Sequence, residues 1–262
     1  MKDFGIIFLS SGRTPYLKAT INSILRSKID LGVFALHVVA NDPSANYDFI
    51  TERSDFVLHN IKETHQSGLL KYAFNLGITY SQCLFIEEDW LFNENLSNDD
   101  LFTLVKIPNT RQILFSKYRL GHEEELSNIW GKSRKKWIDG FNREVLEIDT
   151  YFSLNPTIIK RVVLQEICDK FDWLLPTNSG RFLEMNLDKF LGDKFGPTVS
   201  ISGDPKFNVR HLGILTASKY FRLTKKNRMS QALFIMKVHV FLFKIKDSNY
   251  LLRRIHVPIN FH

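Results

Sequence analysis

Three consecutive carboxylates interrupt an apolar run in this chain. In "CLFIEEDWLF", residues 83–92, four apolar residues lead into Glu87, Glu88 and Asp89, and three more apolar residues follow. A solvated loop would not be flanked by so much hydrophobic surface, so we expect these acids at the end of a buried strand. Carboxylates are hard oxygen ligands of the kind that Mg²⁺ and Mn²⁺ prefer. The alternative is an ordinary acidic strand terminus.

The elements before this cluster alternate between strand and helix patterns. Strands are expected at "FGIIFLS", "FALHVVAND", "DFVLHNI" and "QCLFIEED", and helices at "SGRTPYLKATINSILRS" and "SGLLKYAFNLGITYS". This alternation favours an α/β fold with a mostly parallel sheet. Ligands of such open sheets bind beyond the carboxyl ends of the strands. Three of these ends, "SSGRT", "NDPS" and "EEDW", are polar, so we expect the functional site there.

The order of these segments resembles that of the GT-A glycosyltransferases, and most of all the bacterial family 2 type. The segments that carry the resemblance are "SSGRTPYLKATINSIL", "VVANDPSA", "SGLLKYAFNLGI" and "LFIEEDW", within roughly the first hundred residues. Two departures stand out. Glu87-Glu88-Asp89 replaces the usual Asp-x-Asp, and Asn41 precedes Asp42 where two acids are often found.

The resemblance implies a domain organisation. Residues 1–220 would form one GT-A domain, with a mostly parallel Rossmann-like sheet flanked by helices. Residues 1–100 would be its nucleotide-sugar-binding half, and residues 101–220 its acceptor-side half. Residues 221–262 would form a basic, amphipathic, helical C-terminal tail.

The resemblance also implies a metal site in the acidic cluster. A nucleotide-sugar donor leaves as a diphosphate, and a divalent cation, Mn²⁺ or Mg²⁺, would neutralise the charge that develops. Asp89 matches the last acid of the family motif and is the expected metal ligand. Glu87 would bind through water or contact the donor. Glu88 should point to the opposite side of the strand and brace the neighbouring structure.

Three further residues at strand ends should approach the donor nucleotide by the same resemblance. They are Ser10 and Arg13 after the first strand and Asp42 after the second. The alternative for Arg13 is a solvated residue at the helix start. The alternative for Asp42 is a turn residue that accepts hydrogen bonds from its own backbone within "NDPS".

Two carboxylates in the second half are candidates for the catalytic base. An inverting transfer needs one carboxylate to take the proton of the acceptor hydroxyl. Glu184, near the start of an expected helix in "TNSGRFLEMNLDKFLGDKFG", stands where inverting GT-A enzymes usually present that base. Asp188, one turn later, is the competing candidate. The alternative for Glu184 is an acid favoured by the helix dipole.

Two basic residues and one proline-containing segment complete the candidate features. His211, in "FNVRHLGI", resembles the late His of many GT-A enzymes that joins the metal or a donor phosphate. Arg210 is a candidate phosphate partner. The segment "YFSLNPTIIKRVVLQEI" is expected as a strand, a turn at Asn155-Pro156 and a helix whose apolar face includes Ile158 and Ile159.

Composition and charge distribution limit the classes of protein. Hydrophobic residues make up 44% of 262 residues, enough for a substantial core. The two cysteines form no C-x-x-C pair, and the N-terminus lacks the pattern of an export signal, so we expect a cytoplasmic protein. Residues 219–262 carry ten Lys or Arg and one acid, whereas the rest of the chain is nearly neutral. No nucleic-acid recognition motif is present, so we expect no nucleic-acid partner.

The basic tail contains an apolar segment, "SQALFIMKVHVFLFKI", that is interrupted by charges and too short to span a bilayer. As a helix it would lie on an anionic membrane, here the inner face of the cytoplasmic membrane. Alternatively it packs on the domain or forms an oligomer contact.

The resemblance implies a metal-dependent, inverting glycosyltransferase. It would transfer a sugar from a nucleotide-diphosphate donor to a glycan or lipid-linked acceptor, in bacterial surface polysaccharide synthesis. Two alternatives remain, a nucleotidyltransferase acting on a sugar phosphate and a non-catalytic, membrane-associated nucleotide-sugar-binding module. Against the first, "SSGRT" lacks the longer Gly-rich, basic loop typical of such enzymes.

Overall fold

The computed structural model divides the chain into two compact units, Met1–Arg210 and His211–His262. Almost all of the second unit, including the expected tail, lies outside the described residues. None of the helices that the structure describes is both long and apolar enough to cross a membrane. The description covers residues 2–62, 66–115, 133–138, 143–149, 151–154, 156–173, 180–201 and 207–212.

The first part of the chain alternates strands and helices as the sequence predicts. The β-rich apolar runs form strands, and every residue of the first strand is buried. The elements are β1 (Phe4–Ser10), α1 (Thr14–Leu25), the 3-10 helix η1 (Leu31–Val33), β2 (Ala35–Ala40), α2 (Asp48–Thr51), β3 (Phe56–Asn60), α3 (Gln66–Gly77) and β4 (Gln82–Glu87).

Shorter strands dominate the second part. Its elements are β5 (Trp90–Leu91), α4 (Asn98–Leu104), β6 (Gln112–Phe115), β7 (Ser133–Ile138), β8 (Arg143–Ile148), β9 (Thr157–Lys160), α6 (Arg161–Lys170), α7 (Gly180–Leu191), β10 (Thr198–Ile201) and β11 (Arg210–His211).

Nine of these strands form one mixed sheet in the order β3-β2-β1-β4-β9-β6-β10-β8-β7. The four strands β3, β2, β1 and β4 are mutually parallel. Both β4 and β6 are antiparallel to β9, so β6 and its parallel neighbour β10 run in the same direction as β4. The carboxyl ends of β1, β2, β4, β6 and β10 therefore meet at one edge of the sheet, and the predicted α/β architecture is confirmed.

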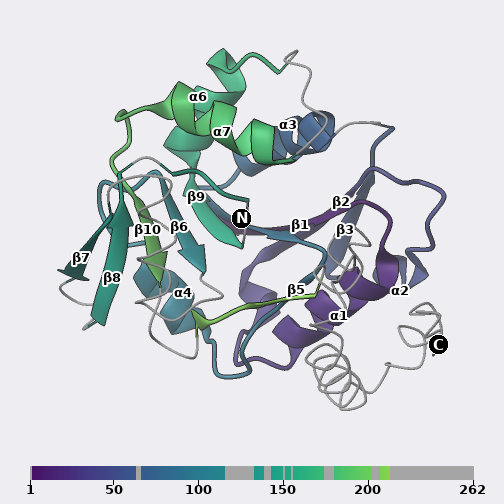
Figure 1. Ribbon diagram of the computed structural model, residues 1–262. Helices are drawn as coiled ribbons and strands as arrows, with labels where there is room; N and C mark the ends of the chain where they lie inside the picture. Colours follow the sequence, from purple (N-terminus) through teal and green to yellow (C-terminus); the bar gives the residue numbers. More distant parts are fainter. Residues whose placement is uncertain are drawn as a thin grey trace, which may run out of the picture. The chain divides into compact units, whose positions relative to one another are not determined.

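Two hydrophobic cores lie on the two faces of this sheet, and different helices cover these faces (Figure 1). Side chains of α1, α2 and α4 pack on one face, and those of α3, α6 and α7 pack on the other. The alternation along β1 divides its residues between them, with Phe8 in the first core and Leu9 in the second. Leu9 is in register with Glu87 on β4, which places Glu87 on the face covered by α3, α6 and α7.

The segment after Asn155-Pro156 differs from the prediction. Ile158 and Ile159, expected on a helix, belong to strand β9, and α6 begins only at Arg161. The strand fills the gap between β4 and β6, and it pairs antiparallel with both. The β-branched run "TII" suits a buried strand better than a helix start, and that preference decides the local structure.

Candidate functional site

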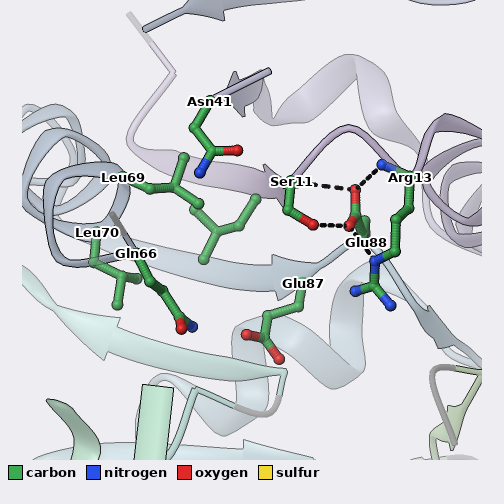
Figure 2. Close-up of a pocket in the computed structure, with 9 residues that line it drawn as sticks. Ser11, Arg13, Asn41, Gln66, Leu69, Leu70, Glu87 and Glu88 are labelled. Carbon is green, nitrogen blue, oxygen red and sulfur yellow. Dashed lines mark hydrogen bonds and ion pairs between the residues drawn. The ribbon is translucent and has the colours of Figure 1, made fainter. Parts of the chain in front are cut away.

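A pocket opens at the carboxyl edge of the sheet, where the strand-end segments converge (Figure 2). Its volume is about 220 Å³. The segment after β1, the residue after β2 and the end of β4 supply its polar lining, and the first turns of α3 supply an amide and two leucines. The lining residues are Leu9, Ser11, Arg13, Asn41, Gln66, Leu69, Leu70, Glu87 and Glu88.

Glu88 binds the last residue of β1 and the loop between β1 and α1 through hydrogen bonds. Its side chain is buried, with 1% of the residue exposed, and its carboxylate accepts five hydrogen bonds from these residues. The donors are Ser10 Oγ at 2.7 Å, the Ser11 backbone N–H at 3.0 Å and its Oγ at 2.5 Å, and Arg13 through its backbone N–H at 3.2 Å and Nε at 2.6 Å. Glu88 is therefore a structural brace, as the strand alternation predicts.

Arg13 connects two of the three carboxylates. Besides the Glu88 contact, its Nη2 lies 2.9 Å from Asp89 Oδ2. The Asp89 side chain is 5% exposed, whereas 41% of the Arg13 side chain faces solvent. A buried carboxylate needs a compensating charge, and the guanidinium supplies it. Arg13 thus lines the pocket and also holds Asp89 in place.

Glu87 is the carboxylate of the cluster that projects into the pocket, away from the Glu88 network (Figure 2). Burial, followed by the negative charges of Asp89 and Glu184, raises the pKa of Glu87 to about 8. These two neighbours come from the residues after β4 and from α7. The charges of Asp89 and Glu184 therefore add to the effect of burial in disfavouring the ionised form of Glu87.

Two predicted nucleotide-binding residues lie behind or beside the pocket lining. Ser10 is fully buried, where its Oγ donates to Glu88 and lies 3.1 Å from the hydroxyl of Tyr47. Asp42 accepts hydrogen bonds from Ser44, through its backbone N–H at 3.0 Å and its Oγ at 2.5 Å, and these bonds lower the pKa of Asp42. Asn41, and not Asp42, lines the pocket.

Asp42 nevertheless contacts the loop that Glu88 braces. Gly12 has a φ of +93°, and a Cβ at this position would lie 2.5 Å from Asp42 Oδ2. Only glycine combines this conformation with so close an approach. The glycine in "SSGRT" thus lets the two strand-end loops come together.

The two candidate bases have different surroundings. Glu184 Oε1 accepts hydrogen bonds from Ser153 Oγ at 3.1 Å and from the Leu154 backbone N–H at 2.5 Å. Asp188 Oδ1 instead lies 2.9 Å from Nη1 of the buried Arg111. Burial raises the pKa of Asp188, and the charge of Arg111 opposes that shift. Asp188 balances a buried cation. The charge of Glu184 instead contributes, after burial and the charge of Asp89, to the raised pKa of Glu87.

Arg210, the predicted phosphate partner, and His211, predicted to join the metal or a donor phosphate, are consecutive in the chain but belong to different units. Arg210 is exposed and is the last residue of the first unit. It belongs to β11, which pairs with β5, the strand that begins directly after Asp89. His211 is half-buried and is the first residue of the second unit.

The acidic residues fit a divalent cation only in part. Within the described ranges, no three His, Cys, Asp or Glu side chains gather as a ready-made metal site. Glu88 is fully engaged by its five donors, which leaves Glu87 and Asp89 as the ligand candidates. Burial, and then the charge of Asp89, raises the pKa of Glu87, and a cation would relieve the repulsion between the two carboxylates. Two hard ligands suffice where phosphate oxygens and water complete the octahedron.

Comparison with known proteins identifies the fold. No protein-family model and no curated protein sequence matches the chain. Solved structures do match. Residues 1–349 of TarS from S. aureus align over 78% of this chain and 59% of their own length, with a TM-score of 0.54 and 14% identity. The mannosyltransferase PcManGT from Pyrobaculum calidifontis, in complex with GDP-Man and Mn²⁺, aligns over 80% and 56%, with a TM-score of 0.53 and 12% identity.

The chain therefore spans less than two thirds of the length of these structures. At such low identity the likeness shows the fold, and the fold is that of GT-A glycosyltransferases. The expectation drawn from the order of the strand-end motifs is confirmed at this level.

The sequence did not single out several residues that line the pocket. Ser11, Asn41 and Gln66 line the pocket, whereas the resemblance indicates the neighbouring Ser10 and Asp42 and no residue at position 66. The polar segments "SSGRT" and "NDPS" indicate the region of Ser11 and Asn41 but not which residue lines the pocket, because both follow the ends of their strands, where alternation no longer applies.

Proposed function

We propose that this protein is a glycosyltransferase that transfers a sugar from a nucleotide-diphosphate donor to a glycan or lipid-linked acceptor. One observation carries the proposal, which is the polar pocket at the carboxyl ends of β1, β2 and β4, with Glu87 in its lining and Asp89 paired with the lining residue Arg13. In an open α/β sheet this edge is where a nucleotide binds. The fold shared with known glycosyltransferases supports the same assignment.

The donor nucleotide would occupy this pocket. Asn41 and Gln66 offer amide groups that can donate to and accept from a base or a ribose, and Leu69 and Leu70 offer an apolar wall. Arg13 is the pocket's cationic group, and it can turn part of its charge toward a phosphate because its side chain is 41% exposed. Ser10 and Asp42 act indirectly, since they shape the loops on either side.

The metal and the base complete the proposed site. Asp89 and Glu87 would hold Mn²⁺ or Mg²⁺, which would offset the negative charge of the departing diphosphate. Glu184 would take the proton of the acceptor hydroxyl in an inverting transfer. Arg210 would add positive charge on the phosphate side, and His211 would join the metal or a donor phosphate. The charge of Glu184 contributes to the raised pKa of Glu87, which supports a place for both residues in one site.

The ligands named for the similar structures support the donor class. TarS has been solved with UDP-GlcNAc, and PcManGT with GDP-Man and Mn²⁺. Both ligands are nucleotide-diphosphate sugars. We extend this class to the present chain, together with divalent-metal dependence and a role in bacterial surface polysaccharide synthesis.

A panel of nucleotides tests the proposal. UDP, GDP, CDP, dTDP and CMP would each be added with Mn²⁺ and with EDTA, and the melting temperature recorded. Stabilisation by one diphosphate that requires the metal would support the donor site and identify its base. A response to none would contradict it. The matching nucleotide sugar would then be incubated with acceptors, because release of the nucleoside diphosphate separates an enzyme from a binding module.

The same assay separates the nucleotidyltransferase alternative. Such an enzyme would consume a nucleoside triphosphate and a sugar phosphate and release pyrophosphate. The proposed enzyme would release a nucleoside diphosphate instead. Pyrophosphate as the product would overturn the glycosyltransferase proposal.

We also propose that residues 221–262 attach the protein peripherally to the inner face of the cytoplasmic membrane. The excess of basic residues near an apolar segment supports this, since each Lys or Arg near an anionic surface adds on the order of 1 kcal/mol. Truncation after Tyr220 should reduce co-sedimentation with phosphatidylserine vesicles, with neutral vesicles as the control. Equal binding by the full and truncated chains would favour packing or an oligomer contact.

A further inference from the structure

We propose that Gln112 and Ser153 are positioning residues that fix the carboxylate of Glu184 in its orientation toward the reaction centre. The inference rests on the proposed function, in which Glu184 is the base. Neither residue lines the pocket, and neither would touch the substrate. They act through a connected series of hydrogen bonds from the middle of the sheet to α7.

The series begins at Gln112 on β6, of which only 1% is exposed. Its Nε2 donates to the Ser153 carbonyl at 2.8 Å, and its Oε1 accepts from the Ser153 backbone N–H at 3.0 Å. Nε2 also donates to Thr157 Oγ1 at 2.9 Å. The side-chain amide thus pairs with both main-chain groups of Ser153, as a neighbouring strand would. Residues 151–154 belong to no strand. The Gln112 side chain therefore supplies the two hydrogen bonds that a neighbouring β-strand would otherwise make with Ser153.

The series ends at one oxygen of Glu184. Ser153 Oγ and the Leu154 backbone N–H both donate to Oε1, at 3.1 and 2.5 Å. The two donors come from the adjacent residues Ser153 and Leu154. Gln112 binds both main-chain groups of Ser153 and so holds this segment in place. Hydrogen bonds from fixed donors select one rotamer of a side chain that would otherwise sample several.

The helix that carries Glu184 is held at a second point one turn later. Asp188 pairs with Arg111, the residue just before Gln112, and Arg111 also donates to the carbonyls of Gly192 and Gly196 near the end of α7. Contacts at Glu184 and Asp188 together fix the rotation of α7 about its axis. Arg111, just before β6, and Gln112, its first residue, therefore determine together which way Glu184 faces.

A stability role alone would not need this arrangement. Glu184 is half-buried on a helix whose apolar residues, such as Leu183 and Leu187, already anchor it in the core. The carboxylate itself is held separately, by two donors from a segment that belongs to no helix or strand. A base must present its oxygen within a few tenths of an ångström, and a displacement of about 1 Å can reduce the rate by about 10²-fold.

The test is a set of variants assayed for sugar transfer and for unfolding. Ser153→Ala removes one donor to Glu184, and Gln112→Met releases the segment that carries both. We expect each to lower kcat by about 10- to 10²-fold and to leave the donor KM within about threefold. The acidic limb of the pH–rate profile should move to higher pH, because a carboxylate that loses donors is protonated more readily. Ser200→Ala, which removes a buried hydroxyl of β10, is the matched control and should match the wild type.

A double-mutant cycle separates positioning from general stability. In a Glu184→Gln background, Ser153→Ala should cause no further loss of kcat, whereas an independent structural defect would add to the first. The same cycle, measured by urea unfolding midpoints, should also be non-additive. An additive cycle, or a Ser153→Ala enzyme with normal kcat and pH profile, would overturn the inference. Should Ser153→Ala not fold, Gln112→Met supplies the same cycle.

Failure of the proposed function looks different from failure of this inference. If the wild-type protein transfers no sugar from any donor that stabilises it, the function of the site is wrong and no base is being positioned. If the wild type is active and only the cycle is additive, the transferase assignment stands and the positioning role falls.

Discussion

Glu88 and Arg13 are joined twice, because the Glu88 carboxylate accepts both the Arg13 backbone N–H at 3.2 Å and its side-chain Nε at 2.6 Å. With the donors from Ser10 and Ser11, this carboxylate is the point around which the β1–α1 loop folds. The acid in the centre of the motif is therefore the one least suited to bind a ligand. Its role in the pocket is to fix the lining.

The first prediction concerns this brace. Glu88→Gln replaces an acceptor-only group by one whose NH₂ faces donors, so a buried network is left unsatisfied. We expect a loss of about 2–4 kcal/mol in the free energy of unfolding. Urea denaturation measures it. Glu87→Gln is the control, because its pKa of about 8 keeps Glu87 largely protonated at neutral pH, and stability should change little. A Glu88→Gln protein as stable as the control would contradict the bracing role.

The second prediction concerns Asp89. Asp89→Asn removes the charge that would bind the metal but keeps the shape of the side chain, so the fold should survive and Mn²⁺-dependent stabilisation by the diphosphate should be lost. Turnover should fall to background. The melting temperature with and without Mn²⁺ checks binding separately from activity. Unchanged activity would exclude Asp89 from the metal site.

The third prediction separates the two acids of α7. Glu184→Gln should spare donor binding and lower the chemical step by about 10²- to 10⁴-fold if Glu184 is the base. Asp188→Asn should instead destabilise the fold, by about 3–5 kcal/mol, because it leaves Arg111 buried without its carboxylate. Single-turnover kinetics and urea unfolding of both variants test this. Full activity in Glu184→Gln would mean that another residue is the catalytic base.

The fold of the first part of the chain was predictable because local and tertiary preferences agree there. Runs such as "FGIIFLS" are β-rich, buried on both faces and followed by polar loops, so pattern and propensity favour the same strand. The "TIIK" segment was mispredicted since a short apolar run next to a helix carries no period of its own. Its strand state follows from the space between β4 and β6, which involves residues far away in the sequence.

The site could be predicted only to the level of its segments. The strand-end loops meet as expected, yet the roles of individual residues depend on which face each one takes. Asn41 lines the pocket while Asp42 bonds its own turn, and the buried Arg111 and Gln112, which hold α7, carry no motif. Their function follows from partners more than thirty residues away, so no local pattern reveals them.

Four side chains on β2, β3, α3 and the turn after it form a continuous hydrogen-bonded row. His37 Nε2 lies 2.5 Å from the Tyr80 hydroxyl, its Nδ1 lies 3.0 Å from His59 Nε2, and His59 Nδ1 lies 3.0 Å from the Tyr72 hydroxyl. With both rings neutral, every contact has one donor and one acceptor. With both rings protonated, the contact between His37 and His59 would bring two donors together.

The last prediction follows from this row. Burial, and then the charge of His59, lowers the pKa of His37 from 6.5 to about 4. The unfolded chain therefore binds the proton first, so stability is full above pH 6.5, declines as the pH falls toward 4 and changes no further below it. The pKa difference corresponds to about 3 kcal/mol. Urea unfolding between pH 7.5 and 4 should show this decline in the wild type, and His37→Gln should flatten it. Parallel curves for the two proteins would mean that other groups cause the acid sensitivity.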